Sequence, residues 1–176
     1  MAIDVFIRAI ADESESLSDA PFHEASDPSP SEIAEFDRFL STLDGEERRV
    51  VVTTLVEQAE ENLELDFTSI FRHFLKDEDD HLVQLGIEGL WEQEDRWLVA
   101  ELVELLRSER GAQVRAAAAV ALGKFPLLAL EGKISPQDGA LIYRVLMDFL
   151  EDEIEDLEVR RRCLEAVAPF LSLIHI

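Results

Sequence analysis

The strongest constraint on the fold of this chain is an internal repeat that superposes without gaps in three places. The copies read DDHLVQLGIEGLW from Asp79, GAQVRAAAAVALG from Gly111 and DLEVRRRCLEAVA from Asp156. Each has an apolar fourth residue, small or compact residues four and seven places later, and a larger apolar residue eight places later. In that order the matched residues are Leu82, Val114 and Val159; Gly86, Ala118 and Cys163; Gly89, Ala121 and Ala166; and Leu90, Leu122 and Val167.

The repeat predicts stacked helix pairs. Small residues let one helix approach its neighbours closely, while the larger residues fill the layer between units. The copies are 32 and 45 residues apart, counted from Leu82 to Val114 and from Val114 to Val159, and we interpret the extra segment, 126–135, as an inserted loop. Because one helix pair cannot bury its apolar face alone, at least three units are expected. The sequence therefore predicts an all-α fold, a right-handed α-α superhelix of about four helix pairs over residues 31–170.

Helical spacing of apolar residues continues through most of this region. The first helix is expected from Ser31, and the D-x-x-E sequence of Asp44 and Glu47 is a typical start for the second. Further helices are expected at residues 66–76, 79–92, 95–108, 112–124, 136–151 and 156–171. We find no convincing strand pattern.

The two ends of the chain differ from the repeat region. Residues 1–11 have one apolar helix face and predict a short helix, which either docks on the main body or serves as a peptide-like tail; docking is favoured because isolated short helices are marginal in water. Residues 12–30, rich in Ser, Pro and acid, predict a solvated, flexible linker.

The last six residues, 171–176, match codons at the start of a transposase adapter used in sequencing libraries. We interpret them as adapter read-through, with a natural apolar tail as the alternative.

One copy of the repeat resembles a known family. The V-R-x-x-A-x-x-A-L-G pattern from Val114 to Gly123 resembles the HEAT repeat, particularly its short bacterial form, which is shared with phycobilisome lyases. The family often has Asp three places before that Val, where this copy has Gly111, and the copy from Asp79 has Val83 where Arg is usual. The resemblance implies an armadillo-like helical solenoid and, through the lyases, a bilin lyase or lyase-like chaperone as one function. It is nearly silent on function otherwise, because such solenoids serve unrelated tasks.

Charge and cysteine content narrow the function classes. With 39 acidic and 16 basic residues the formal net charge is −23, which repels nucleic acid and anionic membrane surfaces. The one cysteine, Cys163, cannot form an intrachain disulfide and fits a reducing compartment. No secretory signal or membrane span is recognisable. We therefore expect a cytoplasmic protein that binds neither nucleic acid nor membranes, in an oligomeric state that the sequence leaves open.

No nucleotide-binding, zinc-protease, redox or hydrolase motif is present, so we expect no enzyme, no cofactor and no metal. Cys163 is expected to be a buried, inert thiol at a core position of its helix. The His and Asp residues within 73–81 have metal-ligand types, but we interpret them as a solvated turn in which Asp79 caps the next helix.

Two arginines, Arg115 and Arg160, occupy the fifth position of the repeat. We expect them to bridge to acidic helix starts in adjacent units, with Asp79 or Asp156 as partner of Arg115. An exposed bridge of this kind contributes well under ~1 kcal/mol.

The best candidate for a binding site is a stripe on the first copy of the repeat. Val83, Ile87 and Trp91 recur every four residues beside the core positions, with Gln84 and Glu88 flanking them. The stripe is expected either to pack between helices or to form an apolar strip on a concave surface. Trp is enriched at binding hot spots, and an acidic rim suits a basic helix or peptide.

The residues thus favour a non-enzymatic protein-interaction scaffold with a protein or peptide partner. A bilin lyase is the alternative, and a DNA repair enzyme would need a basic groove.

Overall fold

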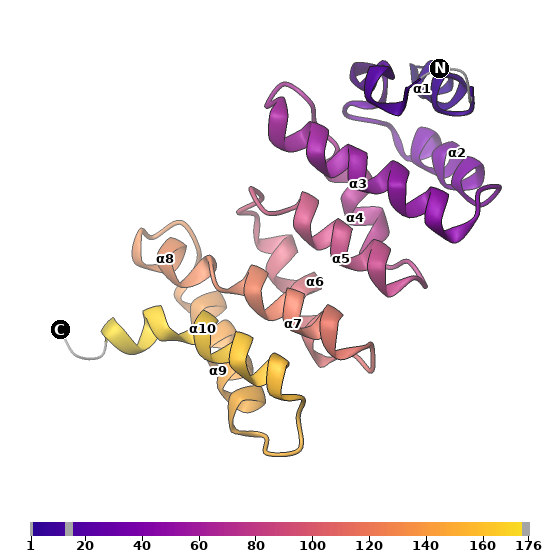
Figure 1. Cartoon of the computed structure of the whole chain (residues 1–176). Helices are drawn as coiled ribbons and strands as arrows, with labels where there is room; N and C mark the ends of the chain where they lie inside the picture. The colour runs from indigo at the N-terminus through magenta and orange to yellow at the C-terminus, as the bar shows by residue number, and fades with distance from the viewer. Residues whose placement is uncertain (1, 13–15, 174–176) are drawn as a thin grey trace. The chain divides into compact units, whose positions relative to one another are not determined.

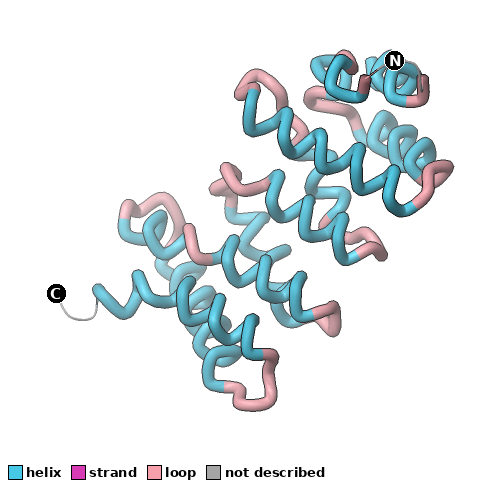
Figure 2. Tube along the Cα trace, viewed as in Figure 1, coloured by secondary structure: helices cyan, strands magenta, loops and turns pink. Residues whose placement is uncertain are grey.

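The computed structural model describes residues 2–12 and 16–173, and every regular element within them is a helix (Figures 1 and 2). The all-α prediction is therefore confirmed for the described residues. The chain divides into two compact units, residues 1–90 and 91–176. The first contains α1 (Ala2–Ile10), the short 3₁₀ helices η1 (Leu17–Asp19) and η2 (Phe22–Ala25), α2 (Pro30–Leu40), α3 (Gly45–Glu61), α4 (Thr68–Phe74) and α5 (Asp80–Gly89). The second contains α6 (Arg96–Arg107), α7 (Ala112–Leu122), α8 (Phe125–Leu130), α9 (Pro136–Glu151) and α10 (Leu157–Leu173).

The N-terminal helix docks, as expected from the weakness of isolated short helices. Ile3 and Phe6 of α1 are fully buried, and the Phe6 ring packs against Phe36 of α2 and against Phe22 of η2, with ring centroids 5.9 and 5.5 Å apart. Burial of these apolar groups stabilises a helix that would be marginal by itself.

The segment expected to be a flexible linker is folded over most of its length. It forms η1 and η2 and buries Phe22 and Ala25. Its backbone is also tied to the chain before α4, where Asp27 N donates to Asp66 O at 2.7 Å and Asp66 N donates to Ser26 Oγ at 2.8 Å. Although Ser, Pro and acidic residues abound in this segment, its buried apolar side chains and these hydrogen bonds hold it in place. Residues 13–15 lie outside the described part.

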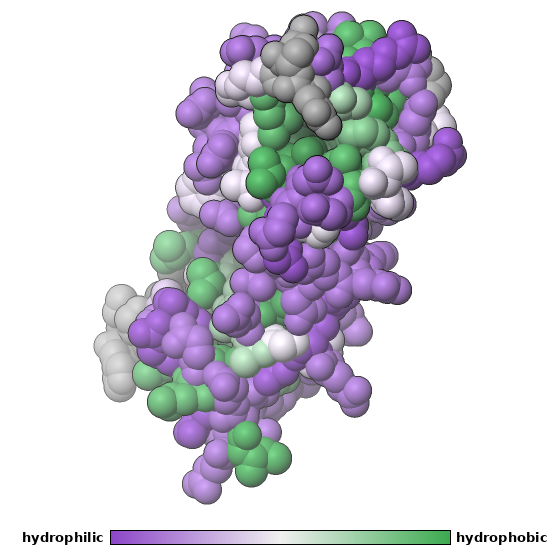
Figure 3. All heavy atoms as spheres, turned by 45° about the vertical axis from the view of Figure 1, so that its right-hand side comes forward, coloured by the Kyte–Doolittle hydropathy of each residue, from purple (hydrophilic) through white to green (hydrophobic). Residues whose placement is uncertain are grey.

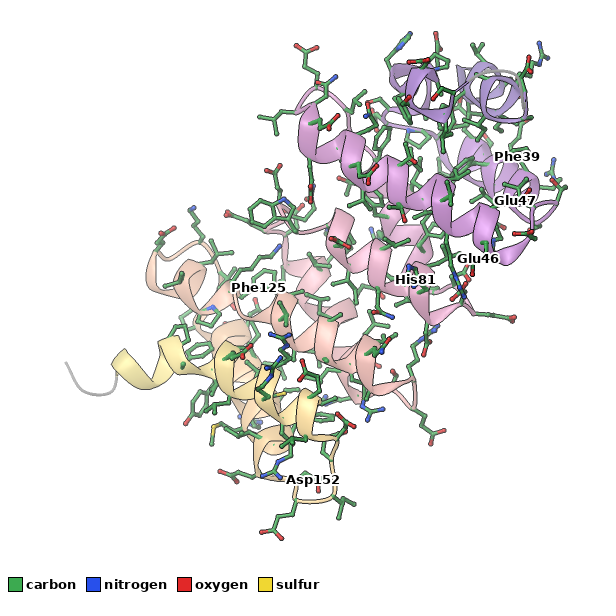
Figure 4. All side chains as sticks on the ribbon, viewed as in Figure 1. Phe39, Glu46, Glu47, His81, Phe125 and Asp152 are labelled. Carbon is green, nitrogen blue, oxygen red and sulfur yellow. The ribbon has the colours of Figure 1, made fainter. Side chains whose placement is uncertain are left out.

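Local signals placed most helix starts correctly. Asp44 and Glu47 form a capping box on α3, each side chain accepting the other's backbone N–H at 2.9 Å, and Figure 4 shows Glu47 in the first turn of that helix. Asp79 caps α5 by accepting from His81 N. Two boundaries were wrong: α5 ends at Gly89 instead of near residue 92, and the expected loop at 126–135 contains most of α8, which buries Phe125 and Leu128. The predicted read-through segment overlaps the end of α10, and residues 174–176 lie outside the described residues.

The small residues of the repeat mark close helix contacts within each unit. Gly86 of α5 lies against α4, where an added Cβ would be 2.9 Å from Phe71 O and 3.2 Å from Phe74 Cβ. In the second unit Ala118 of α7 and Cys163 of α10 are fully buried, as are the large positions Leu122 and Val167. Ala121, expected to be tightly packed, is only half-buried. Matched positions of the repeat are thus mostly the positions at which helices pack closely. The superhelix and the domain boundaries that were predicted with the repeat stay predictions.

Replacing Gly86 with Ala should destabilise the first unit. The new methyl group meets backbone, so the overpacking cost of roughly 1–3 kcal/mol exceeds the gain of about 1 kcal/mol in helix propensity. Gly45→Ala is the matched control, because a Cβ added there, at the start of α3, would meet no neighbour within 4 Å. Urea denaturation followed by circular dichroism should show a lower midpoint for Gly86→Ala alone; equal midpoints would contradict the close contact.

Candidate protein-binding surface

The apolar stripe predicted on the first repeat is mostly inaccessible. Val83 and Ile87 are buried, so they offer no contact area to a partner. Gln84 is half-buried and donates to Asp80 O at 3.1 Å, and Glu88 is exposed. Trp91 is 62% exposed, but it follows the end of α5 and belongs to the second unit, so no continuous helical stripe reaches it. For Val83 and Ile87 the packing alternative is the one observed.

The second unit shows what covers such a stripe. The equivalent residues of α7 are Arg115, Ala119 and Gly123, of which Ala119 is fully buried. A Cβ added at Gly123 would lie 3.3 Å from the Ala166 Cβ of α10. The stripe of α7 therefore faces α10, and Figure 1 shows the two helices side by side. In α7, the stripe that begins at the fifth repeat position is an interface with the next repeat helix.

The corresponding stripe of α10 is open. Its residues are Arg160, Leu164 and Ala168; Leu164 is 49% exposed and Ala168 is exposed too. Leu157, two helical turns before Leu164 and on the same side of α10, is 77% exposed. Ala166 contacts α7 and lies two residues from Leu164 and two from Ala168. A step of two residues is about 200° around the helix axis, so Leu164 and Ala168 are on the side opposite Ala166. The open side of α10 thus points away from α7.

Helix α9 lines a groove next to the C-terminal part of α10. A cavity of about 560 Å³ is lined by one face of α9, by Ala129 of α8 and by Phe170 of α10, and the Tyr143 and Phe170 rings meet edge to face with centroids 5.6 Å apart. The α9 lining residues are at helical spacing and mostly apolar: Pro136, Gly139, Ala140, Tyr143, Arg144, Met147 and Asp148. The core face of α9, with Ile142, Val145 and Leu146, is separate and buried.

The groove face of α9 also points away from the preceding helix pair. Asp138 of α9 accepts a hydrogen bond from Arg96 Nε of α6 at 3.0 Å. Ala140 is two residues further along, about 200° around the axis. We call the open side of α9 and α10 the end face and define it by Pro136, Ala140, Tyr143 and Met147 of α9 with Leu157, Arg160, Leu164 and Ala168 of α10. Figure 3 shows that hydrophobic residues reach the surface among hydrophilic ones on the face in view.

Polar contacts at the start of α9 hold this helix in place. Ser135 caps α9, its Oγ accepting from Asp138 N at 3.1 Å and donating to Asp138 Oδ2 at 2.7 Å. The hydrogen bond from Ser135, helped by the guanidinium of Arg96, keeps the pKa of Asp138 below its ordinary value. Asp138 therefore stays ionised at neutral pH although its side chain is buried.

The repeat arginines act as structural bridges, with partners that differ from those expected. Arg115 Nη2 donates to Glu155 Oε1 at 2.6 Å, in the turn before α10 that also contains Asp152 (Figure 4). The predicted partners of Arg115 were Asp79 and Asp156, and the neighbouring Glu155 takes that place, whereas the Asp156 carboxylate accepts from Glu158 N at 2.8 Å at the start of α10. Asp79 instead accepts from Arg49 of α3 at 2.9 and 3.3 Å.

Arg160 differs from Arg115 in its surroundings. Its Nε donates to Leu150 O, a carbonyl of the last turn of α9, at 3.1 Å. No ion pair of Arg160 is present among the described residues. The next two arginines of α10 are paired: Glu158 accepts from Arg161 and Arg162, each at 2.8 Å.

Two side chains of reactive type elsewhere in the described residues, Cys163 and Lys124, lie in surroundings that are at least partly buried. Cys163 is fully buried, and burial raises the pKa of its thiol to about 12, so the thiolate is scarce at neutral pH. Burial lowers the pKa of Lys124 to about 8, and its Nζ donates to Trp91 O at 2.6 Å. Within residues 2–12 and 16–173 no three His, Cys, Asp or Glu side chains group closely enough to hold a metal ion, and no helix there is long and apolar enough to cross a membrane.

The sequence contained an unused signal for the end face. Pro136, Ala140, Tyr143 and Met147 recur at i, i+4, i+7 and i+11, a second apolar stripe on a helix that already has a core face. A helix with two apolar faces typically packs against a neighbour on each of them.

Cys163 should make the second unit less stable above pH 9. A thiol whose pKa rises from 9.0 to about 12 on folding keeps its proton while the unfolded chain loses one, so the free energy of unfolding falls by about 1.4 kcal/mol per pH unit from pH 9 toward 12. Cys163→Ala should lack this slope. Both tryptophans lie in the second unit, so their fluorescence during guanidinium denaturation at pH 8–10.5, under reducing conditions, measures it. Parallel curves for the two proteins would contradict the burial of the thiol.

Comparisons with known proteins give no relative from which a function could be transferred. No protein-family model, no curated protein and no solved structure matches this chain. The resemblance to HEAT repeats therefore stays a prediction, and the case for function depends on the surface itself.

Proposed function

We propose that this protein is a non-enzymatic interaction scaffold that binds a protein partner through the end face of its second unit. One observation carries the proposal: α9 and α10 leave open the sides that lie opposite their contacts with α6 and α7. An apolar stripe lies on that side of each helix, and a groove of about 560 Å³ is lined by the stripe of α9. Contiguous exposed apolar surface rimmed by polar groups is typical of protein-binding sites.

A HEAT-like right-handed superhelix is part of the proposal. Stacked helix pairs bury their faces against neighbouring pairs, so an apolar side that stays open is a surface that another element can cover. The end face has the apolar residues Leu157, Leu164, Tyr143 and Met147. The net charge of −23 argues against nucleic acid as the partner.

Site-specific photo-crosslinking tests the function. Benzoylphenylalanine at position 164 should form covalent adducts with a protein in a lysate of the source cells, and excess unmodified protein should suppress them. Position 63 is the control, because Leu63 is an exposed leucine of the first unit, at 79%. Adducts that form equally at both positions, or at neither, would show that the end face is not a protein-binding surface.

A further inference from the structure

We propose that the amine of Lys124 is a covalent modification site, which takes an uncharged, apolar aldehyde as a reversible imine. Lys124 lies between α7 and α8 in the second unit (Figure 1). The inference goes beyond the proposed function, since no residue that defines the end face takes part in it. It rests on where the amine is held, on what surrounds it and on how few amines the chain has.

The two chain neighbours of Lys124 hold it in place. Gly123 lies against Ala166 of α10, and Phe125, which is labelled in Figure 4, is fully buried. From this position Nζ donates to Trp91 O at 2.6 Å at the surface of the protein, and it lies 5.2 Å from the centroid of the Phe125 ring. The amine therefore has a defined place, whereas a lysine on an open surface is usually mobile and strongly hydrated.

Partial burial changes the chemistry of this amine. Desolvation disfavours the ammonium form and lowers the pKa of Lys124 to about 8, although the carboxylate of Glu94 offsets part of the effect. Roughly a tenth of the molecules then have a neutral, nucleophilic amine at pH 7, far more than for an ordinary lysine. The bond to Trp91 survives the loss of the proton, because a carbonyl accepts from an amine as well as from an ammonium group.

Few other amines compete with Lys124. The chain has three lysines, and arginines make up the rest of its 16 basic residues. Lys76, in the first unit, is exposed to water. Lys133 Nζ lies 3.0 Å from Glu131 Oε2 and 3.6 Å from Glu94 Oε2, and the hydrogen bond with Glu131 raises the pKa of Lys133. Burial thus favours the neutral amine at Lys124, whereas pairing with carboxylates opposes it at Lys133.

Exposed apolar side chains accompany this amine. The hydrogen bond joins Lys124 to Trp91, while Val120 and Leu127 lie one turn before it and three residues after it in the chain. These three apolar side chains are 62%, 52% and 54% exposed, respectively. An aromatic or aliphatic group on the electrophile can cover such side chains while its reactive carbon meets the amine, because apolar surfaces associate in water.

Charge selects against anionic electrophiles. Residues 91–96 and 124–133, the two segments that meet at the amine, contain four carboxylates and three cations. They offer no excess of positive charge to attract an acyl phosphate or a phosphorylated aldehyde, and the net charge of −23 repels such anions. An uncharged aldehyde meets no such barrier and reacts with an amine without prior activation.

The reaction needs no oxidant and no reductant. The lone pair of the Lys124 amine adds to the carbonyl carbon, and the resulting carbinolamine loses water, which takes the carbonyl oxygen and both amine hydrogens. A C=N double bond to Nζ remains. When this imine takes up a proton, its single N–H can donate to Trp91 O as the amine did. Hydrolysis reverses the reaction and returns the free lysine.

Labelling with 2-naphthaldehyde tests the site. The full-length protein reacts with a limiting amount at pH 7, borohydride reduces the imines to stable amines, and a glutamate-specific protease with mass spectrometry locates them. Lys124 should have at least about ten times the adduct of Lys133, since the neutral fraction of an amine changes about tenfold per pKa unit. This preference should disappear in urea. Lys124→Arg should remove the dominant adduct, and Lys133→Arg, the matched control, should leave it unchanged.

Three comparisons test the pH dependence and the class of ligand. Labelling of Lys124 should level off above pH 8, whereas labelling of Lys133 should continue to rise, because its pKa is raised. Glyoxylate, an anionic aldehyde without an apolar group, should prefer Lys124 less. Trp91→Ala, which keeps the backbone carbonyl and removes the indole, should weaken the preference of the naphthaldehyde. Equal labelling of the three lysines, a preference that persists in urea, or a preference that ignores both glyoxylate's charge and the loss of the indole would overturn the inference.

Discussion

The close approach of neighbouring helices determines most of what is observed in each unit. A helix can approach another closely only where side chains are small, and the chain places such residues at fixed points: Gly86 against α4, and Gly123 against Ala166 of α10. These contacts orient the large residues around them, so that Leu82, Val114 and Val159 are all fully buried at the same repeat position. Because the interior is close-packed, a methyl group in the wrong place cannot be absorbed.

The ion pairs between arginines and carboxylates depend on the same packing of helices. The chain has only 16 basic residues for 39 acidic ones, and several of the cations join elements that are distant in sequence. Arg49 binds the cap of α5, Arg96 binds the start of α9, and Arg115 binds the turn before α10. Each guanidinium meets a carboxylate at or near a helix N-terminus, where the helix dipole favours negative charge. Basic residues used in this way fix helix starts.

The sequence predicted what depends on spacing and missed what depends on which neighbour lies on which side. Apolar and small positions of the repeat, the capping box at Asp44, and the burial of Cys163 followed from local pattern. The exposure of a stripe did not, because Ile87 and Leu164 occupy the same position of their repeats, and only packing decides that the first is buried and the second open. Two short helices were missed for a related reason. Phe22 and Phe125 are buried in η2 and α8, which are too short to show a periodic pattern of apolar residues. The choice of Glu155 over Asp156 for Arg115 depends on the shape of one turn, which no spacing rule specifies.

The end face has the physical properties that make docking inexpensive. Its residues lie on α9 and α10, which are held by the Ser135 cap, by Arg96 and Asp138, by Arg115 and Glu155, and by the packing of Ala166 on α7. A partner would meet side chains whose backbone is already ordered, so association loses less conformational entropy than it would on a loop. Burial of Leu157 and Leu164, both well exposed in the free chain, would then contribute to binding at about 25 cal/mol per Å² of apolar area removed from water, before the costs of association.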